Sequence, residues 1–123
     1  MPRYILLEHR GAPDDPAGLH YDLMVEDGDA CRTWRLAALP PAGGGEVTAT
    51  EIARHRLAWL DAVAEDVSGG RGSVQRIAAG TCSPVGADPV TVEIHDGPFA
   101  GRFAIMPAGR DDRSAFDQER TSD

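Results

Sequence analysis

The chain has no lysine; all 12 of its basic residues are arginine. This absence excludes any mechanism that requires a lysine nucleophile or a lysine Schiff base. Positive charge is scarce as well, since 20 acidic residues leave a formal net charge of −8. Proteins that bind DNA irrespective of its sequence usually present a basic surface. Charge alone therefore does not indicate a nucleic-acid partner.

Long apolar runs and cysteines are also few. No stretch approaches the length needed to cross a bilayer, and no apolar leader follows Met1. Two cysteines, Cys31 and Cys82, are more typical of reduced thiols than of a disulfide in a chain without an export signal. We therefore expect a soluble, cytoplasmic monomer that has no membrane partner.

The length of 123 residues is sufficient for one domain with one core. The final stretch differs from the rest, because residues 110–123 carry five acids and three arginines and almost no apolar residues. We expect a folded domain over residues 1–108 and a disordered charged tail over residues 109–123.

Short segments rich in β-forming residues, separated by turn signals, predict an all-β fold. No alternation of strands and helices is present, which argues against a doubly wound sheet. Residues 46–66 are ambiguous, because apolar residues recur at roughly helical spacing while residues 55–60 also permit a strand. We expect a mainly antiparallel, compact β-barrel with short helical or loop insertions. Its strands are predicted at residues 3–8, 19–26, 30–36, 73–79, 90–95 and 101–106.

The second predicted strand carries a histidine and an aspartate two residues apart. Side chains at such spacing lie on one face of a strand, so His20, Asp22 and Met24 share a face. His9 ends the preceding strand, and an antiparallel pair would bring it opposite them. Two imidazoles and a carboxylate suit Mn²⁺, Zn²⁺ or Fe²⁺. A lone histidine is more often structural, but this grouping predicts a metal site.

Two further segments could bind an anion. His55 and Arg56 could hold a phosphate, with His55 also acting as a general acid; the alternative is a solvated helix face. The glycine-rich turn at residues 68–72 offers backbone N–H groups and the guanidinium of Arg71. Such a turn is more often only a hairpin connection, and it lacks the length and the lysine of a P-loop.

Motifs spread over residues 4–106 follow one another in a consistent order. They lie at residues 4–9 (YILLEH), 20–28 (HYDLMVEDG), 32–36 (RTWRL), 55–61 (HRLAWLD), 68–74 (SGGRGSV) and 97–103 (GPFAGRF). In this order they resemble the 3′-phosphoesterase domain of bacterial ligase D, the multidomain end-joining DNA ligase. They look most like the small stand-alone proteins related to that domain.

The resemblance implies a compact β-barrel that binds Mn²⁺ and removes a 3′-phosphate or a 3′-ribonucleoside from a DNA primer–template end in repair. It also implies end-joining proteins as partners. By resemblance His9, His20 and Asp22 match the metal ligands, and His55 matches the histidine that contacts the scissile phosphate.

The sequence departs from the family pattern on the substrate side. Met24 stands where the active domains carry an arginine, and Trp59 stands where they carry a tyrosine. Arg56 and Arg71 are the candidates to supply the missing positive charge. Two alternatives follow: a catalytically inactive metal-binding or regulatory module of an end-processing assembly, or a metal-dependent β-barrel acting on a small non-nucleic substrate. The acidic charge favours the second alternative.

Overall fold

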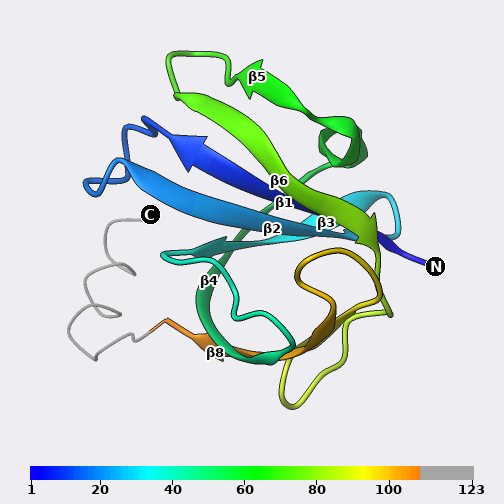
Figure 1. Cartoon of the computed structure of the whole chain (residues 1–123). Coiled ribbons are helices and arrows are strands. Elements are labelled where there is room, and N and C mark those ends of the chain that lie inside the picture. The colour runs from blue at the N-terminus through cyan, green and yellow to red at the C-terminus, as the bar shows by residue number, and fades with distance from the viewer. Residues whose placement is uncertain (109–123) are drawn as a thin grey trace.

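The computed structural model of the chain describes residues 1–108. One eight-stranded sheet dominates, in the order β5-β6-β1-β2-β3-β4-β8-β7, and Figure 1 shows how it curls from β5 round to β8. The disorder predicted for residues 109–123 falls outside the described residues and stays a prediction. The elements are β1 (Arg3–Arg10), β2 (Leu19–Asp27), β3 (Ala30–Leu36), β4 (Gly45–Arg56), the 3₁₀ helix η1 (Leu57–Asp61), β5 (Ala64–Asp66), β6 (Ser73–Thr81), β7 (Thr91–Ile94) and β8 (Gly101–Pro107).

The sheet is mixed but mostly antiparallel. Every neighbouring pair of strands runs antiparallel except β4 and β8, which are parallel. The prediction of an all-β, mainly antiparallel fold is therefore confirmed. All six predicted strands are present, although most extend one or two residues further than predicted.

The ambiguous segment at residues 46–66 is mainly strand. β4 continues to Arg56, and only η1 is helical before the short strand β5. The reason is tertiary: alternate β4 residues Val47 and Ala49 are buried, whereas their neighbours are exposed. This period of two matches a strand that covers a core on one face only.

Two clusters of buried side chains lie on opposite faces of the central strands. On β1, Tyr4 and Leu6 belong to the larger cluster, and Ile5 and Leu7 belong to the smaller one. The smaller cluster also takes in Leu60 of η1, so η1 covers this face of the sheet. Burial of each such large side chain contributes roughly 1.5–3 kcal/mol, which makes β1 and its neighbours a firm base for polar groups at the strand ends.

The chain directly after β6 is hydrogen-bonded to β7. The Ser83 N–H donates to the Glu93 carbonyl at 2.9 Å, and the His95 N–H donates to the Thr81 carbonyl at 3.0 Å. Because β7 ends the strand order far from β6, these bonds connect distant parts of the sheet.

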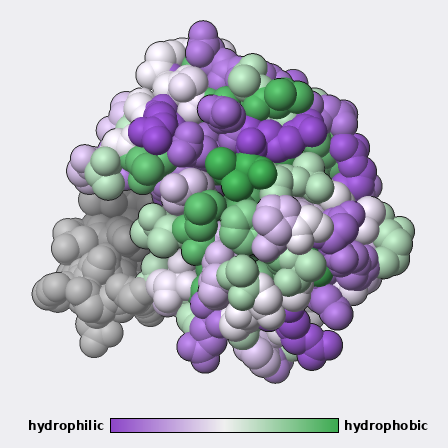
Figure 2. All heavy atoms as spheres, viewed as in Figure 1, coloured by the Kyte–Doolittle hydropathy of each residue, from purple (hydrophilic) through white to green (hydrophobic). Residues whose placement is uncertain are grey.

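The surface is a mixture of polar and apolar residues. Figure 2 shows small apolar patches near the middle of this face and strongly hydrophilic residues over the region of β5 and β6. Within residues 1–108, no helix has the length and apolar character needed to cross a membrane. Both cysteines are buried and free, as the sequence predicted.

Candidate metal centre

Three polar side chains meet where β1 ends and β2 begins. In the antiparallel register His9 lies directly opposite His20, and Leu7 lies opposite Asp22. His20 and Asp22 are buried, with 3% and 4% of their surfaces exposed. One potential ligand atom from each of His9, His20 and Asp22 lies within 4.8 Å of the others. The predicted grouping on one face is therefore confirmed.

The loop between β1 and β2 fixes this register. The Gly11 N–H donates to the Gly18 carbonyl at 3.1 Å, which closes the loop directly beyond the His9–His20 pair. Both glycines adopt positive φ, a conformation that other residues rarely take. The two histidine rings are consequently held with their centroids 4.7 Å apart.

Asp15 determines which nitrogen of His20 faces the cluster. Nδ1 of His20 lies 2.8 Å from Oδ2 of Asp15. The hydrogen bond with His20 lowers the pKa of Asp15, so this carboxylate is an ionised acceptor and Nδ1 is the donor. The neutral ring then has a lone pair on Nε2, which lies 3.2 Å from Oδ1 of Asp22. Within residues 1–108, neither of these two buried atoms has a hydrogen-bond partner.

His9 is oriented in a similar way by a backbone carbonyl. Its Nε2 lies 2.8 Å from the carbonyl oxygen of Arg71, which can only accept, so Nε2 carries the proton. In the neutral ring the lone pair is then on Nδ1, 3.1 Å from Oδ2 of Asp22. Both imidazoles thus direct a lone pair toward the same carboxylate.

This arrangement favours a positive charge, which a metal ion or a second proton on one of the rings would supply, since His9 Nδ1 lies at hydrogen-bond distance from Oδ2 of Asp22. Two nitrogen lone pairs and a carboxylate converge in a largely buried space, and without a positive charge between them they repel one another. Imidazole nitrogens and carboxylate oxygens are suitable ligands for several divalent metals. Outer carboxylates and carbonyls that hold metal-binding histidines are typical of such centres. The cluster could therefore bind a metal ion, of undetermined identity.

Asp15 was not predicted from the sequence as a residue of the site. It lies in the loop between β1 and β2. Its Oδ1 also accepts the Ala17 N–H at 3.1 Å, so the loop fixes the carboxylate. A carboxylate five residues before a predicted ligand His20 was the available signal, because metal-bound histidines usually donate their second N–H to such a group.

His55 and Arg56 are not joined to the cluster. His55 on β4 lies opposite Cys31 on β3, and Cys31 lies opposite Glu26 on β2. His55 is therefore on the same face of the sheet as His20, but it is level with the C-terminal end of β2, whereas His20 is at the N-terminal end. Nδ1 of His55 donates to the Ala53 carbonyl at 2.8 Å. Arg56 is the adjacent strand residue and points to the opposite face. The side chains of His55 and Arg56 therefore do not form one phosphate-binding site, as the sequence had suggested.

The backbone of Arg71, but not its side chain, contacts the cluster. Its carbonyl accepts from His9, whereas its guanidinium folds back onto Ser68, donating to the carbonyl at 2.7 Å and to Oγ at 3.0 Å. Gly72 makes this position possible, because at φ +89° a Cβ there would collide with the Arg10 carbonyl oxygen. The glycine-rich turn thus orients a histidine, a role that the sequence did not predict.

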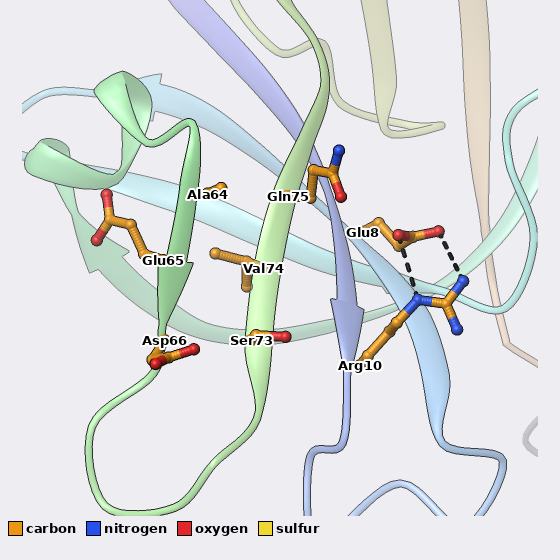
Figure 3. Close-up of a pocket in the computed structure, with 8 residues that line it drawn as sticks. All are labelled: Glu8, Arg10, Ala64, Glu65, Asp66, Ser73, Val74 and Gln75. Carbon is orange, nitrogen blue, oxygen red and sulfur yellow. Dashed lines mark hydrogen bonds and ion pairs between the residues drawn. The ribbon is translucent and has the colours of Figure 1, made fainter.

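A separate pocket lies over the β5, β6 and β1 edge (Figure 3). It measures about 350 Å³. Glu8 and Arg10 in this pocket pair with each other at 3.2 Å, and Glu65 and Asp66 add acidic groups. The pocket contains none of the three cluster residues, so it is not the metal centre.

No protein-family model matches the chain, and no curated protein matches it. The resemblance to the ligase D 3′-phosphoesterase domain consequently stays a prediction from the motifs and their order. The His–His–Asp cluster stands on the geometry described above.

Proposed function

We propose that the protein is a metal-dependent phosphoesterase-like domain that acts on DNA 3′ ends in repair, removing a 3′-phosphate or a 3′-ribonucleoside. The observation that supports this most is the convergence of His9 Nδ1, His20 Nε2 and the Asp22 carboxylate, with both rings oriented from outside the cluster.

We further propose that the ion is Mn²⁺ and that the sheet forms the compact β-barrel typical of the family. Manganese accepts the mixed nitrogen and oxygen donors present here. The hydrogen bonds that join residues 81–83 to residues 93–95 support a closed arrangement of the strands.

Each residue has a defined task in this proposal. A bound divalent ion would act as a Lewis acid on a phosphoryl oxygen. Nδ1 of His55 donates to the Ala53 carbonyl, so Nε2 would face the departing side of the phosphate and would protonate it from the doubly protonated ring. Arg71, whose backbone adjoins His9, would turn its exposed guanidinium toward negative charge. Arg56 is the weaker candidate because it points away from this face.

Specific observations favour a second candidate function, a metal-dependent domain acting on a small phosphate ester. The net charge of −8 opposes a polyanion. Met24 is 2% exposed and packs in the smaller core, so the position of the family's arginine is closed off. A regulatory module without catalysis would bind the same metal and leave every phosphate ester intact.

The test is phosphate release from a primer–template with a 3′-phosphate, using metal-stripped protein with and without Mn²⁺. The proposal predicts release by the wild type and none by His20→Ala. His55→Ala should reduce the rate while Mn²⁺ affinity stays unchanged, because His55 does not touch the cluster. His95→Ala is the matched control: His95 bonds Ser83 and lies away from the cluster. Metal binding without release from any substrate would contradict the enzymatic proposal.

A further inference from the structure

Arg35 is the cationic side chain that the register places beside the metal cluster. It lies directly opposite Asp22 in the β2–β3 pair, so both side chains are on the same face of the sheet. Arg35 was not predicted from the sequence as a site residue. Its side chain is 29% exposed, which leaves the guanidinium accessible from one side.

The guanidinium of Arg35 is poorly satisfied by the protein. Its buried Nε has no hydrogen-bond partner among the residues that the structure describes. Its ion pair is a long contact of 3.4 Å between Nη1 and Oδ2 of Asp14, a carboxylate that is 70% exposed. An exposed pair of this geometry is weak, and a doubly charged oxyanion would replace it readily.

A pocket of about 490 Å³ extends from Arg35 to His20, the one of the three cluster residues that lines it. His20 and Asp15 lie in its wall together with Arg35. Much of the remaining wall is apolar, with Ala38, Leu39 and Pro41 among its residues, and its polar groups are Thr48, Thr50 and the carboxylate of Glu46. Its volume is in the range of sites for small organic ligands, which combine apolar walls with a few fixed polar groups.

Arg35 also supplies a positive charge on the face where Met24 stands in place of the family's arginine. Met24 and Asp22 lie on the same strand face, whereas Arg35 reaches that face from the adjacent strand. The guanidinium of Arg35, on the adjacent strand, can donate hydrogen bonds to a phosphate, whereas the thioether of Met24 cannot.

We propose that Arg35 and the metal cluster together form a subsite for a phosphate monoester, with the organic group of the ester in the Arg35 pocket. The planar guanidinium donates to the phosphoryl oxygens, and the apolar wall covers a group of about nucleoside size. This inference rests on the proposed metal site and names its substrate class. Arg35 binds the phosphate in the role that the family's arginine, here replaced by Met24, would have.

The experiment uses the full chain loaded with Mn²⁺ and two probes, inorganic phosphate and a nucleoside 3′-monophosphate. Paramagnetic broadening of the ³¹P signal by Mn²⁺ measures how tightly each probe binds near the metal. Mn²⁺ affinity is measured separately by electron paramagnetic resonance. The variants are Arg35→Met, Arg35→Lys and the matched control Arg102→Met, whose exposed arginine on β8 lies at the remote Glu93 contact.

We expect Arg35→Met to weaken binding of both probes about tenfold or more, as loss of a charge-assisted contact does, with Mn²⁺ affinity within about twofold of wild type. Arg35→Lys should recover part of the affinity, and Arg102→Met should change nothing. The nucleotide should bind more tightly than inorganic phosphate. Equal phosphate affinity in Arg35→Met and wild type would overturn the inference, as would no phosphate binding to Mn²⁺-loaded wild type. Failure of Mn²⁺ itself to bind would instead overturn the metal site.

Discussion

His20 lies between two carboxylates that use it differently. Its Nδ1 is 2.8 Å from Asp15 and donates a hydrogen bond, whereas its Nε2 is 3.2 Å from Asp22 and forms no hydrogen bond in the described part of the chain. A neutral imidazole has only one proton, so donation to Asp15 leaves a lone pair directed at Asp22. This is the arrangement of a histidine prepared for a metal ion.

Substitution of Asp15 by asparagine should weaken Mn²⁺ binding about 10- to 100-fold, because a neutral amide replaces the charged carboxylate that accepts from Nδ1 of His20 and fixes its tautomer. The fold should persist, since Asp15 lies in a surface loop. Asp14→Asn removes the same charge one residue earlier and should leave Mn²⁺ affinity unchanged. Isothermal titration of both variants measures the difference. Equal affinities would show that Asp15 does not orient His20.

Gly72→Ala should damage stability and metal binding together. The added Cβ would collide with the Arg10 carbonyl oxygen at a left-handed φ of +89°, which should lower the free energy of unfolding by about 2 kcal/mol or more. The displaced turn would also withdraw the Arg71 carbonyl from His9. Gly70→Ala is the control. Gly70 has a φ of +70°, and a Cβ added there would meet open space, so this substitution should lower the free energy of unfolding by only about 1 kcal/mol. Urea unfolding and Mn²⁺ titration test the two effects. If Gly72→Ala bound Mn²⁺ as well as Gly70→Ala does, the carbonyl would have no orienting role.

Met24→Arg, which restores the family's residue, should destabilise the protein. Met24 is 2% exposed and packs with Leu7 and Leu60. A guanidinium forced into this cluster should lower the free energy of unfolding by roughly 2–4 kcal/mol, as an unpaired buried charge does. Met24→Leu should cost less than about 1.5 kcal/mol. Denaturant unfolding compares the two. A stable Met24→Arg protein would mean that this face can open to a substrate.

The buried thiols should make stability fall at high pH. Burial raises the pKa of Cys82 from an ordinary value near 9 to about 11, and burial also raises the pKa of Cys31. Between these values the folded chain retains protons that the unfolded chain releases. The stabilisation is therefore complete below pH 9 and declines as the pH rises toward 11. Urea unfolding from pH 8 to 11 should show this slope, and Cys82→Ala should reduce it. An unchanged slope in the variant would assign the effect to other groups.

The part of the site that follows strand geometry was predictable. Alternation along residues 19–26 placed His20 and Asp22 on one face, and the short loop after His9 brought the second imidazole opposite. Asp15 was not predictable by the same means, because a loop has no period that relates its side chains to a strand face.

Contacts that depend on strand register, or on which face of a strand the rest of the protein buries, could not be predicted from the sequence either. Arg35 is 13 residues from Asp22, and only the β2–β3 register makes them neighbours. Residues 46–66 combine helical spacing with alternation, and burial of one β4 face decided between them. The sequence thus predicted the fold class and three cluster residues, whereas the residues that orient them required the structure.

The most direct measurement is a Mn²⁺ titration of metal-stripped wild type and His20→Ala, followed by electron paramagnetic resonance and thermal unfolding. The account predicts one saturable Mn²⁺ site in the wild type. Binding should stabilise it by about 2.7 kcal/mol when free Mn²⁺ is a hundred times the dissociation constant. His20→Ala should remain folded, with neither the site nor the stabilisation. No saturable site in the wild type, or the same site in His20→Ala, would contradict the account.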